Sequence, residues 1–507
     1  MERRTASAIP SPIAARAAPP FIRRDSLASR LAAGGSRERG RQVLFPTVEF
    51  AIFFPIVLAI SWALMPRQHW WKPFIVIASY VFYAAADPRF CLLLGAITLV
   101  SQGAVVAIHR TEDERLRKLF TGIGVAFDLG VLAVFKYYGF FVSDVSDALD
   151  SVGLGSPLPL VTIALPVGVS FFSFQAVTYV VDVKRRQTEP ANLLDAAIYL
   201  SFFPHLVAGP IVRASEFLPQ LKEPRDPNRV AVGAGLTLIA LGLVKKVMIA
   251  DYLGREVVDK VFAVPQAFSA PDAILGAYAY AAQIFCDFSG YTDLAIGLAL
   301  LMGFVFPQNF NSPYRATGFR DFWRRWHMTL SRFLRDYLYI PLGGNRKGRL
   351  RTYINLMATM TLGGLWHGAA WNFVAWGAYQ GTGLSAEHAS KGRLGRIFPG
   401  WLRWFVTFNL IVVGWILFRS TSLANFGDYM SALVRSGPAT LYSVPVVGAI
   451  ALVIGLQLLP ERPMEGIELR LGRLQPLLLG AALALVVLIV GATVPSQGVP
   501  PFIYFRF

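Results

Sequence analysis

The chain has 507 residues, of which 54% are hydrophobic and only 16% are charged, and its mean hydropathy is +0.49. A water-soluble protein needs more charge than this to cover its surface, so the composition excludes a wholly soluble protein and places much of the chain in lipid. The net charge of +17 by itself suits a nucleic-acid-binding protein. Cys91 and Cys286 both lie in apolar segments, which argues against a disulfide framework or a cysteine-based metal site.

Apolar runs recur along the chain, and roughly ten to twelve of them span or partly span the membrane if a span takes about 20 residues. The clearest runs are 50–65, 91–108, 119–141, 160–181, 230–250, 273–304, 401–418, 442–459 and 477–494. Residues 74–86 and 193–212 are shorter or interrupted, which is typical of re-entrant or tilted helices, and Pro204 and His205 indicate a break near a cavity. The runs do not alternate apolar and polar residues, so they predict an all-α polytopic membrane protein.

Two segments hold most of the positive charge. Residues 1–42 carry a net charge of +6 and residues 309–351 a net charge of +8. Basic loops beside membrane helices stay on the cytoplasmic side, so topology explains the second segment without nucleic acid. Residues 1–42 are rich in Ala, Pro, Ser and Arg without apolar periodicity, which predicts a disordered extension or a mis-assigned start before one membrane domain over 43–507.

Residues 319–340, FRDFWRRWHMTLSRFLRDYLYI, predict a strongly amphipathic helix near 320–338. At 100° per residue the arginines and aspartates share one side and the aromatic residues and leucines the other, with His327 at the boundary. Such a helix lies at the cytoplasmic interface or lines a polar cavity. Interfacial anchoring explains the arginines and aromatic residues, whereas the position of His327 favours a functional role.

Residues 352–385 contain no Asp, Glu, Lys or Arg, and His367 is the one side chain there that titrates near neutrality. On a continuous helix the small residues Gly363, Gly364 and Ala370 share its face, where they permit close helix packing or leave room for a slender substrate. A lone intramembrane histidine either bonds to a neighbouring helix or acts as a general base, because desolvation favours the neutral imidazole. The residues alone leave both roles open.

Two carboxylates, Asp287 and Asp293, interrupt the apolar run 273–304. Their spacing of six residues places them on different faces of a continuous helix, unless Gly290 breaks it. Charged groups are costly inside a membrane and are retained there for pairing or function. Ion pairs with the arginines of 319–340 are the favoured interpretation, ahead of a direct part in catalysis.

In order and spacing, several stretches resemble the membrane-bound O-acyltransferase family, and within it the alginate O-acetylases and D-alanyl transferases of the bacterial cell envelope. The resemblance covers residues 43–507 and leaves 1–42 outside. The matching stretches are FFPHLVAGPI, DFSGYTDLAIGLALLMGF, NFNSPY, FRDFWRRWHMTLSRFLRDYLYIPLGGNRKG, LGGLWHGAAWNFVAWGAYQG and FIYFRF.

The resemblance implies helices around a tunnel, with His367 as the essential catalytic residue and His327 as a second active-site position. It implies transfer from a cytoplasmic thioester, with acetyl-CoA as the ultimate donor and no bound prosthetic group or metal. For this branch it further implies a multi-pass protein of the bacterial inner membrane and a secreted polysaccharide, such as alginate, as acceptor. Periplasmic acetyltransferase proteins, and an acyl carrier as a further candidate, are the implied partners.

Substrate or donor contacts are expected at Trp371, Asn372, Arg324, Arg346, Arg349, Asp287 and Asp293. The arginines at 346 and 349 suit long-range attraction of an anionic donor such as CoA, although membrane topology alone predicts the same charges.

Other functions remain open on the sequence. D-alanyl transfer to a cell-wall polymer uses the same kind of site. A transporter or flippase for an acylated intermediate would place the same buried His and Asp residues along a pathway. A non-catalytic assembly subunit would need neither histidine for chemistry.

Overall fold

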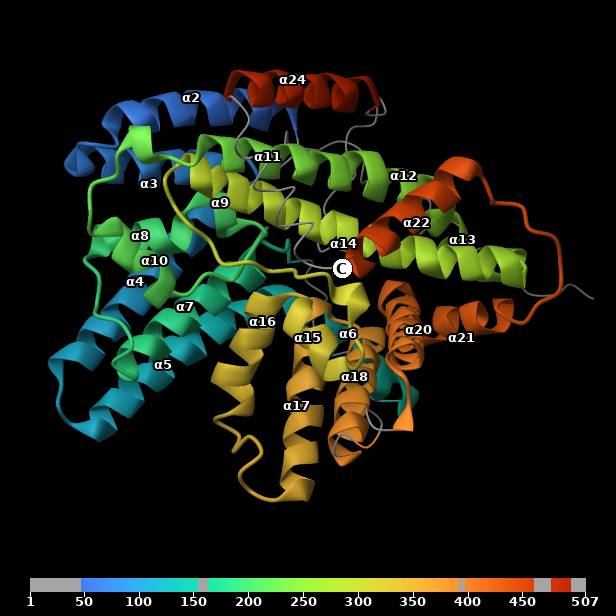
Figure 1. Cartoon of the computed structure of the whole chain (residues 1–507). Helices are drawn as coiled ribbons and strands as arrows, with labels where there is room; N and C mark the ends of the chain where they lie inside the picture. The colour runs from blue at the N-terminus through green and yellow to red at the C-terminus, as the bar shows by residue number, and fades with distance from the viewer. Residues whose placement is uncertain (1–46, 154–162, 391–392, 394–396, 460–475, 494–507) are drawn as a thin grey trace, which may run out of the picture. The chain divides into compact units, whose positions relative to one another are not determined.

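The computed structural model describes residues 47–153, 163–390, 393, 397–459 and 476–493 (Figure 1). The chain divides into two units, 1–42 and 43–507, and every described residue belongs to the second. The disorder predicted for 1–42 therefore concerns residues outside the described part. The described residues form helices and turns without any strand, so the predicted all-α fold is confirmed.

The first half of the second unit is a series of helices that pack against their neighbours in the chain, with α5 continuing through the π-helical turn η1 into α6. These elements are α2 (Val48–Leu64), α3 (Gln68–Ala84), α4 (Arg89–Arg110), α5 (Glu114–Leu132), η1 (Ala133–Tyr137), α6 (Tyr138–Ser151), α7 (Val169–Lys184), α8 (Leu193–Ser201), α9 (Phe203–Leu206) and α10 (Ala214–Phe217). The gap between α8 and α9 is the break that Pro204 and His205 predicted.

The second half begins with a helical rod of α and π segments that packs along α14, and among the described residues four helices follow the α17/α18 hairpin (Figure 1). These elements are α11 (Val232–Leu243), η4 (Val244–Ala250), α12 (Asp251–Leu253), η5 (Gly254–Val258), α13 (Asp259–Ala263), α14 (Ala270–Leu301), α15 (Phe319–Arg325), α16 (Met328–Phe333), η8 (Leu334–Tyr339), α17 (Arg349–His367), α18 (Trp371–Ala389), α20 (Gly400–Arg419), α21 (Leu423–Ala432), α22 (Val444–Leu458) and α24 (Pro476–Thr493).

Five helical stretches among the described residues are long and apolar enough to cross a membrane, which supports a multi-pass membrane protein. They are 89–110, 114–151, 232–263, 270–301 and 400–419. Three shorter apolar helices lie at 49–64, 444–458 and 480–489. All of these fall on runs predicted from the sequence, whereas the total of ten to twelve spans stays a prediction.

Glycines bring α11 and α14 into close contact. A Cβ on Gly242 would lie 2.6 Å from the carbonyl oxygen of Gly290, and a Cβ on Gly297 would lie 2.7 Å from that of Gly235. Small residues let helix backbones approach in this way inside membranes. Helix α14 runs unbroken through Gly290, so the break considered at that glycine is wrong, and its role is packing.

Candidate active site

The helix predicted over 319–340 is interrupted at Trp326 and His327. Helix α15 ends at Arg325, Trp326 is extended, and His327 has the left-handed conformation φ 43°, ψ 54° before α16 starts. The segment is helical, as predicted, but the assumption of one continuous helix is wrong. A left-handed histidine is uncommon and strained, and such strain is concentrated at functional sites.

Asn309, from the NFNSPY stretch, holds the chain just after this break. Its backbone carbonyl accepts a hydrogen bond from the amide of Met328 at 2.9 Å. Its side-chain oxygen accepts from the amide of Thr329 at 3.1 Å and from the hydroxyl of Thr329 at 2.9 Å. The same hydroxyl accepts from the amide of Ile211 at 2.9 Å. The loop therefore fixes the turn that presents His327.

The His327 side chain is completely buried against aromatic rings. Its ring lies 4.7 Å from that of Phe288 and 6.1 Å from that of Trp366, measured between centroids. Neither ring nitrogen has a hydrogen-bond partner among the residues that the structure describes. Burial lowers the pKa of His327 to about 3, so the imidazole is neutral at physiological pH.

His367 is the last residue of α17 and is 2% exposed. Three rings surround its imidazole edge to face, those of Trp366, Trp376 and Phe418, at centroid distances of 5.0, 5.2 and 5.4 Å. His327 is close enough to interact with it electrostatically. Two histidines 40 positions apart in the sequence thus meet around the indole of Trp366.

The chain turns sharply directly after His367. Gly368 is extended, at φ −158° and ψ 147°, and α18 begins at Trp371, so the continuous helix assumed for 352–385 is wrong. A Cβ on Gly364 would lie 2.3 Å from the carbonyl oxygen of Phe373. Gly364 therefore allows close packing of α17 against α18. Of the two roles predicted for it, helix packing and room for a substrate, the structure supports helix packing.

Trp371 and Asn372 lie next to the site but are engaged with protein. The Trp371 indole is 58% exposed and donates a hydrogen bond to Asp144 at 2.8 Å. The buried Asn372 amide donates to the backbone carbonyl of Ser420 at 2.8 Å. Asn372 thus ties the start of α18 to the end of α20.

The three predicted arginines are exposed at the surface, whereas both histidines are buried. Arg324 is exposed on α15, Arg346 is exposed in the loop before α17, and Arg349 is exposed at the first residue of α17. At 1.5 Å per residue, the 18 helical steps from Arg349 to His367 correspond to about 27 Å. Direct contact of Arg349 with His367 is thereby excluded in this conformation, and so is contact of Arg346, which lies three residues before Arg349.

The carboxylates of α14 pair with lysines. Lys246 Nζ lies 2.6 Å from Asp287 and 2.7 Å from Asp251, and all three side chains are almost fully buried. Lys245 Nζ lies 2.7 Å from Asp293. Both lysines belong to η4, which packs beside α14, and neither was anticipated from the sequence. Pairing of these carboxylates with the arginines of 319–340 stays a prediction.

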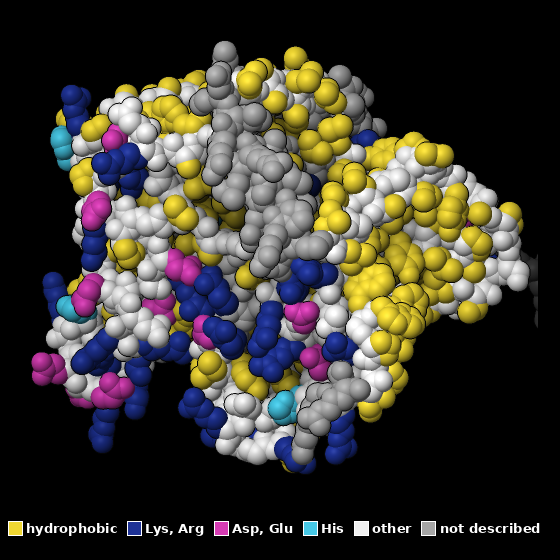
Figure 2. Space-filling model, in the orientation of Figure 1, with side chains coloured by type: hydrophobic (Ala, Val, Ile, Leu, Met, Phe, Trp, Pro, Cys, Tyr) yellow, Lys and Arg dark blue, Asp and Glu magenta, His cyan; other side chains and the backbone are white. Residues whose placement is uncertain are grey.

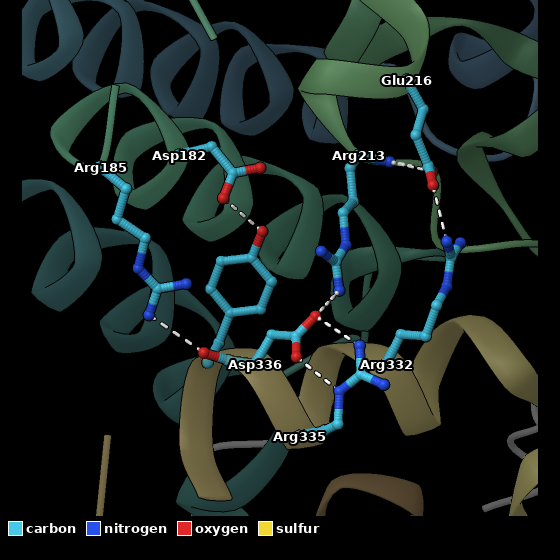
Figure 3. Close-up of polar contacts among 8 residues, drawn as sticks. Asp182, Arg185, Arg213, Glu216, Arg332, Arg335 and Asp336 are labelled. Atoms are coloured by element: carbon cyan, nitrogen blue, oxygen red, sulfur yellow. Dashed lines mark hydrogen bonds and ion pairs between the residues drawn. The ribbon is translucent and has the colours of Figure 1, made fainter. Parts of the chain in front are cut away.

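Two of those arginines, Arg332 and Arg335, form a second polar cluster that holds α16 and η8 in place (Figure 3). Arg332 bonds to Glu216 at 2.8 Å, and Asp336 accepts from Arg213 at 2.7 Å and from Arg335 at 2.6 Å. Burial raises the pKa of Asp336, but the bonds from Arg335 and Arg213 outweigh it and leave that pKa below its usual value.

Charge and apolar side chains are segregated on the face drawn in Figure 2. Lys and Arg side chains gather over α15 and α16, whereas hydrophobic side chains cover α20 and α22. Within the described residues, no group of three or more His, Cys, Asp and Glu side chains is arranged to hold a metal.

Two contributors to the site were not singled out in the sequence. The Trp366 ring lies near both histidines, and its position directly before His367 is the signal that could have drawn attention to it. Lys136 donates to the backbone carbonyls of Trp366 and His367. A lone lysine inside the apolar run 119–141 was the corresponding signal.

Comparison with known proteins identifies the family. The profile of the membrane-bound O-acyltransferase family matches residues 160–426. The chain is 39% identical to the "Probable alginate O-acetylase AlgI" of Pseudomonas aeruginosa, over 84% of this chain and 81% of the relative. It is 36% identical to a peptidoglycan O-acetyltransferase of Helicobacter pylori, over 72% and 73%. A teichoic acid D-alanyltransferase of Streptococcus thermophilus is 29% identical over 44% and 57%. The chain belongs to the membrane-bound O-acyltransferase family and is an O-acyltransferase.

Proposed function

We propose that the protein transfers acetyl groups from a cytoplasmic thioester toward hydroxyl groups of a cell-envelope polysaccharide, with His367 as the catalytic base. The observation that carries this proposal is the meeting of two buried histidines, His327 and His367, around Trp366 in otherwise apolar surroundings. Ionisable groups are costly to place there and are retained for function. An alginate-like acceptor is supported by the alginate and peptidoglycan O-acetyltransferase relatives.

The proposed reaction is a single acyl transfer. A neutral His367 imidazole accepts the proton of the acceptor hydroxyl, and the hydroxyl oxygen attacks the carbonyl carbon of the thioester. The C–S bond breaks, an ester C–O bond forms, and the departing thiolate takes the proton back from the imidazolium. Enclosure by Trp366, Trp376 and Phe418 keeps water from the base and so disfavours hydrolysis of the donor.

His327 is proposed to orient one of the substrates. Its imidazole is neutral, so one ring nitrogen donates and the other accepts a hydrogen bond. Both nitrogens lack a partner within the described residues, which leaves them available to a substrate carbonyl or hydroxyl. The left-handed backbone that Asn309 and Thr329 maintain sets the direction of this side chain.

Acetyl-CoA is the proposed ultimate donor, delivered directly or through an acyl carrier. The Lys and Arg side chains gathered over α15 and α16 suit approach of an anionic thioester (Figure 2). Arg324, Arg346 and Arg349 act at long range in this scheme, since all three are exposed. Alanine at Arg346 and Arg349 should raise the apparent KM for acetyl-CoA a few-fold at low ionic strength and leave kcat unchanged.

Location and partners follow from the same scheme. A thioester made in the cytoplasm and a secreted acceptor require the protein to lie in the bacterial inner membrane. Periplasmic acetyltransferase proteins would then complete transfer to the polymer. In the test of this scheme, the hydroxyl groups of an alginate oligosaccharide stand in for the acceptor that these proteins provide. D-alanyl transfer is the second candidate, supported by the D-alanyltransferase relative, which matches a smaller part of the chain.

The test uses the purified full chain in proteoliposomes with acetyl-labelled CoA and an alginate oligosaccharide. His367→Ala should lower label transfer by at least about 100-fold, the usual contribution of a general base. The thermal unfolding midpoint serves as the folding control. Undiminished transfer in His367→Ala would remove that residue from catalysis. Label transfer that needs a D-alanyl thioester instead would favour the second candidate, and transport without transfer would favour a flippase.

A further inference from the structure

The rod formed by α5, η1 and α6 crosses the end of α17 where His367 lies. Lys136 is in the middle of this rod, in the π-helical turn η1, within one of the candidate membrane spans. A cation in such a segment is costly unless it is paired. No acidic residue pairs with Lys136 among the described residues, and its bonds go to the backbone of α17 instead.

The Lys136 ammonium is saturated by three oxygen atoms. Nζ donates to the carbonyl of Trp366 at 2.5 Å, to the carbonyl of His367 at 3.1 Å and to the hydroxyl of Ser170 at 3.4 Å. Three acceptors match the three N–H donors of a charged lysine. The adjacent Tyr137 hydroxyl donates to the carbonyl of Leu365 at 3.0 Å.

These carbonyls are the ones that a helix leaves unsatisfied. The last four carbonyls of an α-helix have no partner within it, and α17 ends at His367. Gly368 continues in an extended conformation rather than in a left-handed cap, so the chain does not close its own end. Lys136 and Tyr137 satisfy three consecutive carbonyls, and the charge of Lys136 complements the negative end of the helix dipole.

The same rod also contacts the far side of the turn after His367. Asp144 of α6 accepts the hydrogen bond of the Trp371 indole at 2.8 Å, and the Phe140 ring lies 5.7 Å from the Trp371 ring. Residues 365–371 are therefore held by the rod at both ends. The π-helical turn lies where the rod meets α17, and such turns are frequent at functional sites.

We propose that Lys136 is a positioning residue that fixes the His367 imidazole through the terminal carbonyls of α17. This inference rests on the proposed function, in which His367 is the catalytic base. Lys136 touches the backbone on both sides of the His367 Cα, so its loss lets the end of the helix unwind and moves the imidazole relative to the thioester. A displacement of this kind lowers turnover more than it lowers donor affinity.

The experiment measures kcat and KM for acetyl-CoA in the full chain, by free-thiol release with an alginate oligosaccharide as acceptor. Lys136→Met should lower kcat by about 100-fold, the cost of a displacement of about 1 Å, and keep KM within about twofold. Lys136→Arg restores donors and charge, and should recover kcat to within about tenfold of the parent. Tyr137→Phe removes one donor and should lower kcat several-fold.

Lys72→Met is the matched control. Lys72 lies on α3, away from the turn at 365–371, and it pairs with Asp195 of α8 at 2.7 Å. This variant should leave kcat at the parent value. His367→Ala in the same assay separates the two proposals. An inactive His367→Ala together with a fully active Lys136→Met overturns the positioning role alone. An active His367→Ala overturns both. If Lys136→Met does not fold, the variants Lys136→Arg and Tyr137→Phe test the positioning role in its place. An unchanged kcat in Tyr137→Phe together with an inactive Lys136→Arg contradicts the inference.

Discussion

The ammonium of Lys246 and the carboxylate of Asp287 lie 2.6 Å apart, with side chains that are 2% and 4% exposed. Removing Asp287 leaves Lys246 with Asp251 as its carboxylate partner at 2.7 Å, so the buried ammonium loses part of its compensation. Asp287→Ala should therefore lower the free energy of unfolding by about 1.5–3 kcal/mol, the cost of one hydrogen bond to a charged group, as measured by denaturant titration in mixed micelles. Turnover per folded molecule should stay close to the parent value if the pair with Lys246, which supports the packing of α14, is the main role of Asp287.

Asp293→Ala is the control for Asp287. Its pair with Lys245 is more exposed, at 29% and 18% for the two side chains, so the loss of stability should be clearly smaller. A low turnover in folded Asp287→Ala would instead support the substrate contact that is expected at Asp287 from the sequence.

The left-handed backbone of His327 gives a second prediction. A residue with a Cβ costs about 1–2 kcal/mol in that conformation, whereas glycine adopts it freely. His327→Gly should therefore be more stable than His327→Ala by about that amount, although both lose the imidazole and both should be similarly impaired in acyl transfer. Denaturant titration and the transfer assay on the two variants check this. Equal stabilities would show that the left-handed conformation is not maintained in either variant.

Membrane helices were predictable because their signal is local. The run 91–108 became α4 with bounds of Arg89–Arg110, since helix formation in lipid depends mainly on the apolar length of the segment itself. The two histidines were singled out from the residues and the family pattern, and the structure places both in buried positions near Trp366.

The ends of the helices around those histidines were not predictable from the segment alone. Distant residues determine them: Asn309 holds the turn after His327, and Lys136, 231 positions away in the sequence, satisfies the end of α17 at His367. The lysine partners of Asp287 and Asp293 were missed for the same reason, because they depend on which helix packs beside α14.

Close packing between α17 and α18 gives a third prediction. A Cβ on Gly364 would meet the backbone of Phe373 at 2.3 Å, and backbone cannot move aside as a flexible side chain can. Gly364→Ala should destabilise the protein by about 1–3 kcal/mol and, by displacing the end of α17, reduce turnover. Gly122→Ala is the matched control on α5, where no atom lies within 4 Å, and it should be neutral or slightly stabilising. Similar behaviour of the two variants would contradict the packing role of Gly364.

Burial of His327 gives the stability a defined pH dependence. Its pKa is lowered to about 3 in the folded protein from an ordinary value near 6.5. Below pH 6.5 the unfolded chain binds a proton at this residue and the folded protein does not, so stability is full above that pH and falls as the pH drops toward 3. The contribution is at most about 1.4 kcal/mol per pH unit. Denaturant titrations of the parent and His327→Gln between pH 7 and pH 5 check this, since the variant should show a shallower fall. Parallel curves would mean that His327 takes up a proton in the folded state, and the neutral imidazole proposed to orient the substrate would then be wrong.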